Sequence, residues 1–274
     1  MNSDNQIWEI LQNDFEYLQE EGYEVLGVFL FGSQNYGCAL DTSDVDVKAI
    51  VIPSVQQMIL GDIEIKLTIK RSEGELTVFD IVSMHKSFKK QNINFMEILF
   101  TEFRIINPKY EKLYSPLFEE KEHIARMNPF RCIHAQYGNA ENKYKKFLNP
   151  CVSNIERIKK YGYDNKALAD VLRYEDFMSK FLNLRNYSDC LIASRPDYLK
   201  WLKAGDSIYS LEEATQIMEK AYNHINEMYM NVIRESEDKC NSLTLNIIDE
   251  VTENCCRAYI KERCYIESWP TLSY

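Results

Sequence analysis

The sequence predicts an α+β protein in which a small mixed β-sheet with flanking helices is followed by an all-helical C-terminal domain. In the first half of the chain, short apolar runs typical of strands alternate with segments whose apolar residues recur at helical spacing. Later in the chain, only the helical spacing is found. The 274 residues, of which 45% are hydrophobic, can form one large core or two smaller ones. We therefore expect one domain at residues 1–125 and a helical domain at residues 126–274.

The first domain is expected to contain two helices and four strands. Its strands are nearly unbroken apolar runs, typical of a buried sheet, or alternate apolar with polar residues. The expected elements are a helix at 6–20, strands at 25–31 and 45–52, a hairpin of 63–70 and 75–82 joined over 71–74, and a helix at 84–100 with a break near 92–94.

The second domain is expected to consist of amphipathic helices alone. Asn128 and Pro129 suit an N-cap and a first helical turn. Ser210 and Glu213 form a capping box that opens a long helix. Two further helices are expected over residues 165–183 and about 245–263, because their apolar residues fall on one face.

Charge and composition exclude several functions. Lys and Arg total 32 against 42 Asp and Glu, so the net charge is −10 and long duplex DNA is not an expected partner. No apolar run is long enough to span a membrane, and the N-terminus lacks the basic and apolar regions of a signal peptide. A cytoplasmic protein with no membrane partner is expected.

The eight cysteines are expected to be reduced thiols, as in the cytosol. None of them has C-x-x-C spacing, and the four histidines are scattered without an H-E-x-x-H motif, so a zinc site of these types is not expected. Two interpretations of Cys240, Cys255, Cys256 and Cys264 stay open, namely a metal site and partly buried free thiols on helices.

The segments that carry chemistry follow the first two strands. Gly32 and Ser33 end a buried strand, where a sharp turn and a following helical turn would direct backbone N–H groups and a hydroxyl at a phosphate. Asp44 and Asp46 are two residues apart at the start of the next strand, so both carboxylates share one face. Carboxylates with substrate phosphates are the usual ligands of Mg²⁺. The pair of motifs predicts a nucleoside-triphosphate site.

A third carboxylate is expected on an adjacent strand if two metal ions are held. Asp80 is the candidate, because an acid within an apolar strand needs a partner or a metal. Glu64 and Glu75 are next in line. The alternative for Asp80 is an ion pair with a lysine at the strand end.

Three basic residues are candidates for substrate binding. Lys48 shares a strand face with Asp46, where it would neutralise the carboxylates, contact phosphate or form a structural ion pair. Lys166 and Arg173 are two helical turns apart on one face, either reaching the triphosphate across the cleft between domains or facing solvent. Three basic strings are candidates for an RNA surface, although most such strings are solvated: Lys86/Lys89/Lys90, Lys143/Lys145/Lys146 and Arg157/Lys159/Lys160.

The Gly-Ser turn followed by Asp-x-Asp resembles the nucleotidyltransferase superfamily of DNA polymerase β. In detail, residues 32–37 and 43–48 resemble the YcgL-type predicted nucleotidyltransferases of bacteria and phages. Asn92 and the string Glu97-Ile98-Leu99-Phe100 resemble that group's GNP…ELLF block, although Gln91 and Ile93 replace its glycine and proline. We expect Asn92 and Glu97 to cap and orient a helix near the site. Residues 201–205 and 210–213 resemble a later block, so the resemblance spans residues 25–235.

The resemblance implies transfer of a nucleoside monophosphate from a triphosphate to an acceptor hydroxyl, with release of pyrophosphate. It implies two Mg²⁺ ions, or Mn²⁺ in their place, held by Asp44, Asp46 and Asp80. The acceptor stays open between a short RNA or tRNA end, a protein and a small molecule. Two alternatives are a catalytically idle nucleotide-binding regulator and the enzymatic half of a toxin or defence pair. The presence of all three acids favours an active enzyme.

Overall fold

A computed structural model describes residues 4–205 and 209–266 of the chain. Its sheet has five strands in the order β3-β4-β2-β1-β5. The strands are β1 (Glu24–Phe31), β2 (Asp46–Ile52), β3 (Lys66–Lys70), β4 (Glu75–Asp80) and β5 (Arg104–Ile106). The helices are α1 (Asp4–Glu20), α2 (Val55–Leu60), α3 (Ile81–Lys89), α4 (Ile93–Met96), α5 (Glu111–Glu119), α6 (Lys121–Ala125), α7 (Pro129–Phe147), α8 (Ile155–Tyr161), α9 (Asn165–Leu182), α10 (Tyr187–Leu191), α11 (Pro196–Ala204), α12 (Leu211–Glu235) and α13 (Ser242–Ile266). Short 3₁₀ helices lie at η1 (Ser33–Tyr36) and η2 (Glu97–Leu99).

The sheet is mixed, which confirms the predicted α+β class. β1 and β2 are antiparallel neighbours, β2 and β4 are parallel, and β3 with β4 forms the predicted hairpin. The edge strand β5 pairs antiparallel with β1 and was not predicted. It has only three residues, too few to show a period.

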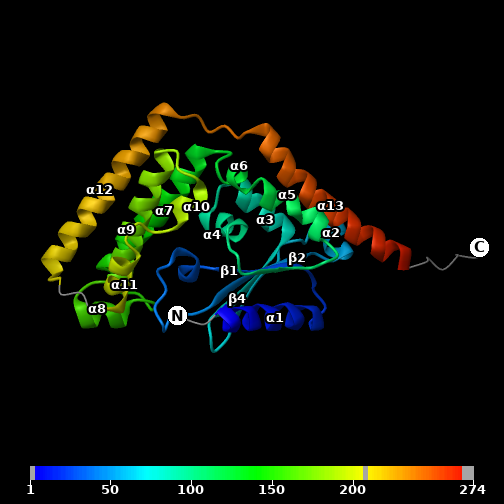
Figure 1. Cartoon of the computed structure of the whole chain (residues 1–274), viewed down its shortest axis with the longest axis horizontal. Helices are drawn as coiled ribbons and strands as arrows, with labels where there is room; N and C mark the ends of the chain where they lie inside the picture. The colour runs from blue at the N-terminus through cyan, green and yellow to red at the C-terminus, as the bar shows by residue number, and fades with distance from the viewer. Residues whose placement is uncertain (1–3, 206–208, 267–274) are drawn as a thin grey trace, which may run out of the picture.

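Alternation along β2 divides the core into two layers. Val45, Val47 and Ala49 pack with α1 on one face of the sheet, whereas Ile50 and Ile52 belong to the larger core on the other face. Figure 1 shows α1 on one side of the strands and α3, α5 and α13 on the other. The same alternation directs Asp46 and Lys48 away from α1, toward the helical part of the molecule.

The helical part is built around α9, which packs against α7, α10, α11 and α12. The long helix α12 begins with the predicted capping box of Ser210 and Glu213, and Asn128 caps α7 as expected. Helix α13 departs from the predicted division at residue 126, because it returns to pack against α3, α5 and β2 (Figure 1). Residues on both sides of that division therefore share one large core.

The cysteines do not form disulfides, and burial raises the pKa of the Cys255 thiol to about 12. Over residues 4–205 and 209–266, no group of three or more His, Cys, Asp or Glu side chains is arranged to hold a metal ion. None of the helices in these two ranges is long and apolar enough to cross a membrane.

Candidate active site

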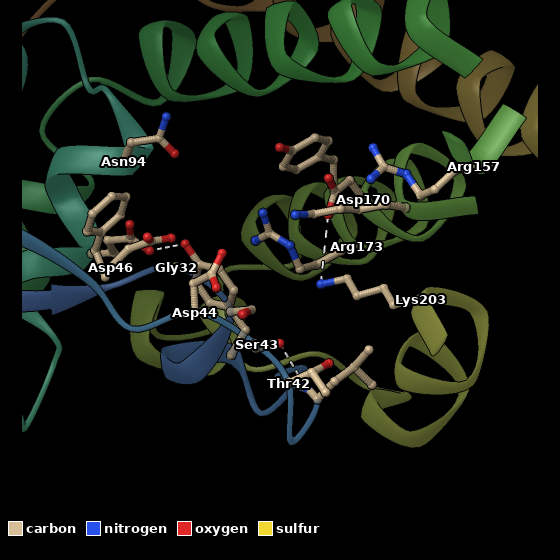
Figure 2. A pocket seen from close by; sticks show the side chains of 17 residues that line it. Gly32, Thr42, Ser43, Asp44, Asp46, Asn94, Arg157, Asp170, Arg173 and Lys203 are labelled. Atoms are coloured by element: carbon tan, nitrogen blue, oxygen red, sulfur yellow. Dashed lines mark hydrogen bonds and ion pairs between the residues drawn. The ribbon is translucent and has the colours of Figure 1, made fainter. Parts of the chain in front are cut away.

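Six of the eight predicted site residues line one cavity of about 400 Å³ between the sheet and the helical part. The size suits a small-molecule ligand. Gly32, Ser33, Asp44 and Asp46 come from the sheet side, and Lys166 and Arg173 come from α9. In Figure 2 the acidic residues Asp44 and Asp46 lie across the cavity from Arg173 and Lys203. Lys48 and Asp80 do not line this cavity.

The turn after β1 has the conformation that the Gly-Ser pair predicts. Gly32 has φ of +89°, a backbone conformation that residues with a side chain rarely adopt. The following residues form the short 3₁₀ helix η1, and Asn35 Nδ2 anchors it by donating to the Leu30 carbonyl at 3.0 Å. The Ser33 side chain lines the cavity, so its hydroxyl is placed to donate to a ligand oxygen.

The two acids of the Asp-x-Asp motif form a crowded negative corner. Asp46 begins β2 opposite Phe31, and its Oδ1 accepts a hydrogen bond from the Glu75 backbone N–H at 3.2 Å. Burial raises the pKa of Asp46, the Glu75 N–H opposes this, and repulsion from Asp44 and Glu75 raises the pKa further. A hard divalent cation bound by these oxygens would offset both the burial and the repulsion. The donor set therefore fits Mg²⁺ or Mn²⁺.

The prediction that Asp80 completes the acidic group is wrong. Val47 pairs with Leu76 and Val51 with Asp80, so Asp80 lies at the far end of the parallel pair from Asp46. Five residues of strand separate it from Glu75, about 16 Å at roughly 3.3 Å per residue. Asp80 is buried and caps α3, accepting hydrogen bonds from Ser83 N at 2.7 Å and from Ile65 N at 3.0 Å. Its role in the fold is to join β4 to α3.

The acid beside the Asp-x-Asp pair is instead Glu75. The register that pairs Val47 with Leu76 puts Glu75 next to Asp46 at the start of both strands. The two residues interact through the hydrogen bond from Glu75 N and through the repulsion that raises the pKa of Asp46. Glu75 is exposed and is not among the residues that line the cavity. Glu75 was one of the two acids, with Glu64, that the sequence offered after Asp80, and β4 begins with it.

The opposite wall of the cavity is basic, and its centre is the buried Asp170 of α9. Asp170 binds Lys143 at 2.7 Å and lies 3.9 Å from Lys203, which holds the pKa of Asp170 below its usual value despite burial. The guanidinium of Arg173 lies over the Tyr36 ring at 4.2 Å. Figure 2 shows Arg173 and Lys203 projecting into the same space.

Two basic residues of this wall were not predicted as site residues. Lys203 lies on α11, and its place in the 201–205 block is the only sequence signal that pointed to it. Arg157 belongs to one of the basic strings, yet it lines the cavity and binds Asp164, the residue that caps α9, at 2.7 Å. Its string therefore contributes to the cavity wall as well as to the surface.

Lys48 is buried beneath the site, where it does not face the cavity with Asp46. Its Nζ donates to the Asn94 carbonyl at 2.5 Å, lies 3.5 Å from the centre of the Phe31 ring, and is 3.9 Å from Glu97 Oε1. Burial lowers the pKa of Lys48 to about 7, opposed by the charge of Asp46. Lys48 thus has a structural role beneath the site. This agrees with the ion pair that the sequence offered as one alternative for Lys48.

Glu97 holds the Gly-Ser turn from below. Its buried carboxyl accepts hydrogen bonds from the Tyr36 hydroxyl and from the backbone of Gly32. Burial raises the pKa of Glu97 to about 8, while Arg173 and the Gly32 hydrogen bond oppose that rise. Asn92 caps α4 as predicted, through a hydrogen bond from Asn94 N at 3.0 Å. The orienting role expected for Asn92 and Glu97 is therefore consistent with their positions.

We expect Glu97→Gln to remove a pH dependence of stability. The pKa of Glu97 in the folded state is raised from 4.5 to about 8. The contribution of Glu97 to the unfolding free energy is therefore complete below pH 4.5 and is lost as the pH rises toward 8. The unfolding free energy of the wild type should therefore fall relative to the variant by on the order of 1 kcal/mol per pH unit between these values. Urea unfolding at pH 5, 6, 7 and 8 measures this difference. If the unfolding free energies of the wild type and the variant changed equally with pH, the raised pKa of Glu97 would be contradicted.

No family model matches this chain, and no curated protein matches its sequence. The site is therefore defined by the geometry described above.

Proposed function

We propose that the protein is a metal-dependent nucleotidyltransferase that moves a nucleoside monophosphate from a triphosphate to an acceptor hydroxyl. The observation that carries the proposal is one cavity with a glycine turn and two aspartates on one wall and cationic side chains on the other. Such an arrangement matches a polyphosphate with its cation, because phosphate oxygens need both positive side chains and a metal ion beside carboxylates. The resemblance to the DNA polymerase β superfamily supports the same interpretation.

Each residue has a distinct role in this proposal. Asp44 and Asp46 would hold the metal, Ser33 would donate to a phosphate oxygen, and the cations of α9 would bind the terminal phosphates. Mg²⁺ or Mn²⁺ supplies charge neutralisation at the phosphates and acidifies the acceptor hydroxyl. The acceptor oxygen bonds to the α-phosphorus, the bond from that phosphorus to the bridging oxygen breaks, and pyrophosphate leaves. Positioning and charge stabilisation account for most of the rate.

The activity can be tested before the acceptor is identified. Purified protein is incubated with cell extract, Mg²⁺ or Mn²⁺, and each of ATP, GTP, CTP and UTP labelled at the α-phosphate. We expect label transfer with pyrophosphate release, and the labelled product shows whether the acceptor is RNA, protein or a small molecule. Triphosphate binding without label transfer would support the idle nucleotide-binding regulator instead.

We expect Ser33→Ala to weaken triphosphate binding modestly. The variant removes one hydroxyl that lines the cavity and leaves the Gly32 turn unchanged. One hydrogen bond contributes about 1 kcal/mol, or roughly fivefold in Kd, and more if the phosphate oxygen is charged. Calorimetric titration of both proteins with the preferred triphosphate measures the change. Unchanged affinity would place the phosphates away from this turn.

A further inference from the structure

A second cavity, of about 460 Å³, adjoins the first along the same face of the sheet. The two cavities share Phe31 and Asn94 as a common wall. Alternation along β2 and β4 puts Asp46 and Lys48, and likewise Glu75, Thr77 and Phe79, on this face. The second cavity therefore begins about two residues, roughly 7 Å, along the strands from Asp46.

The lining of this second cavity is basic in a protein of net charge −10. Lys48, Lys66, Lys86 and Lys90 line it, with Glu64 as its single acidic lining residue. Among the described residues, no ion pair joins Lys66, Lys86 or Lys90 to a carboxylate. By contrast, Lys89 lies on α3, the helix that carries Lys86, and is not part of the lining. Its Nζ is 3.3 Å from Asp249 of α13. Within the described part of the chain, three lysines are thus gathered beside the site without acidic partners.

Aromatic rings complete the cavity. Phe79 is half-buried, and its ring meets that of Phe95 edge to face with centroids 4.8 Å apart. Both rings line the cavity beside the lysines. Lysines that bind successive phosphates, next to an aromatic side chain on which a base stacks, are the features that bind single-stranded nucleic acid.

We propose that the second cavity binds the 3′-terminal nucleotides of a single-stranded nucleic acid, which is the acceptor of the reaction. This inference rests on the proposed nucleotidyltransferase function. Lys66, Lys86 and Lys90 bind the phosphodiesters, and the terminal base packs against Phe79. The terminal 3′-hydroxyl then reaches the carboxylates of Asp46 and Glu75 at the start of β2 and β4. Its oxygen bonds to the α-phosphorus of the triphosphate, pyrophosphate leaves, and the hydroxyl proton passes to solvent.

The proposal is tested by binding alone, so that it can fail independently of the transferase function. Fluorescence anisotropy is measured with labelled octamers of single-stranded RNA, single-stranded DNA and a duplex, in EDTA and without triphosphate. We expect the single strands to bind and the duplex to bind at least tenfold more weakly. The Kd values for the RNA and the DNA octamer show which single strand is preferred. A wild type that binds triphosphate and Mg²⁺ but neither single strand would overturn the acceptor proposal and leave the transferase proposal intact.

Variants then locate the binding surface. We expect the double variant Lys86→Gln/Lys90→Gln to bind the single strand at least tenfold more weakly, and the slope of log K against log salt to fall by about 1.4. Phe79→Leu should lose about fivefold or more through weaker stacking. Lys89→Gln is the control, because it removes one positive charge from α3 outside the cavity. All variants should bind triphosphate as the wild type does. Equal losses in Lys89→Gln and in the double variant would overturn the proposal.

Discussion

Asp46→Asn is expected to abolish nucleotidyl transfer while leaving the fold intact. Asparagine keeps an oxygen for the Glu75 N–H but removes the charge that would hold a divalent cation. Because the acids would act on the metal as a unit in the proposed mechanism, we expect a loss of about 10³-fold or more. Asp44→Asn should lose turnover similarly, and the double variant should be little worse than either single variant.

The stability of the metal-free Asp46→Asn protein provides an independent check. Burial and repulsion from Asp44 and Glu75 raise the pKa of Asp46, so its charge is unfavourable in the absence of a cation. We therefore expect Tm without metal to be equal to or above that of the wild type, as is common when an active-site charge is removed. Turnover within tenfold of the wild type would contradict the role of Asp46 as a metal ligand.

The second large effect is expected at Glu75, with Asp80 as its matched control on the same strand. Glu75→Gln should reduce turnover by about 10²-fold or more, because a cation bound at Asp46 would draw in the neighbouring carboxylate of Glu75. Asp80→Asn should keep turnover but lower the stability by about 1–3 kcal/mol, since Asp80 accepts hydrogen bonds from Ser83 and Ile65 within the fold. Steady-state turnover and urea unfolding are measured on both variants. The reverse pattern would restore Asp80 as the catalytic acid.

Most of the fold was predictable because its signals are local. Apolar runs identified β1 and β2, and capping residues located the starts of α7 and α12. The Gly-Ser turn and the Asp-x-Asp pair were predicted to form one site. β1 and β2 pair so that Phe31, the residue before Gly32, lies opposite Asp46. Local patterns could not show that α13 returns to the sheet, since that packing joins residues far apart in sequence.

The error at Asp80 arose from strand register. A count of residues places Glu75 and Asp80 five apart, so they cannot share a strand face. Leu76 and Val78 are buried with α1, which leaves Glu75 on the face of Asp46. The parallel pairing that puts Glu75 beside Asp46 is a long-range property that no local pattern specifies. The burial of Lys48 likewise depends on the packing of Phe31 and Asn94 over its side chain.

A triphosphate site bridged by a metal ion can be tested by calorimetric titration of the wild type with a nucleoside triphosphate, in Mg²⁺ and again in EDTA. We expect binding heat with Mg²⁺, much weaker binding in EDTA, and weak binding under both conditions for Asp46→Asn. Equal affinity with and without the metal, unaffected by Asp46→Asn, would be incompatible with a site in which carboxylates and phosphates share a cation.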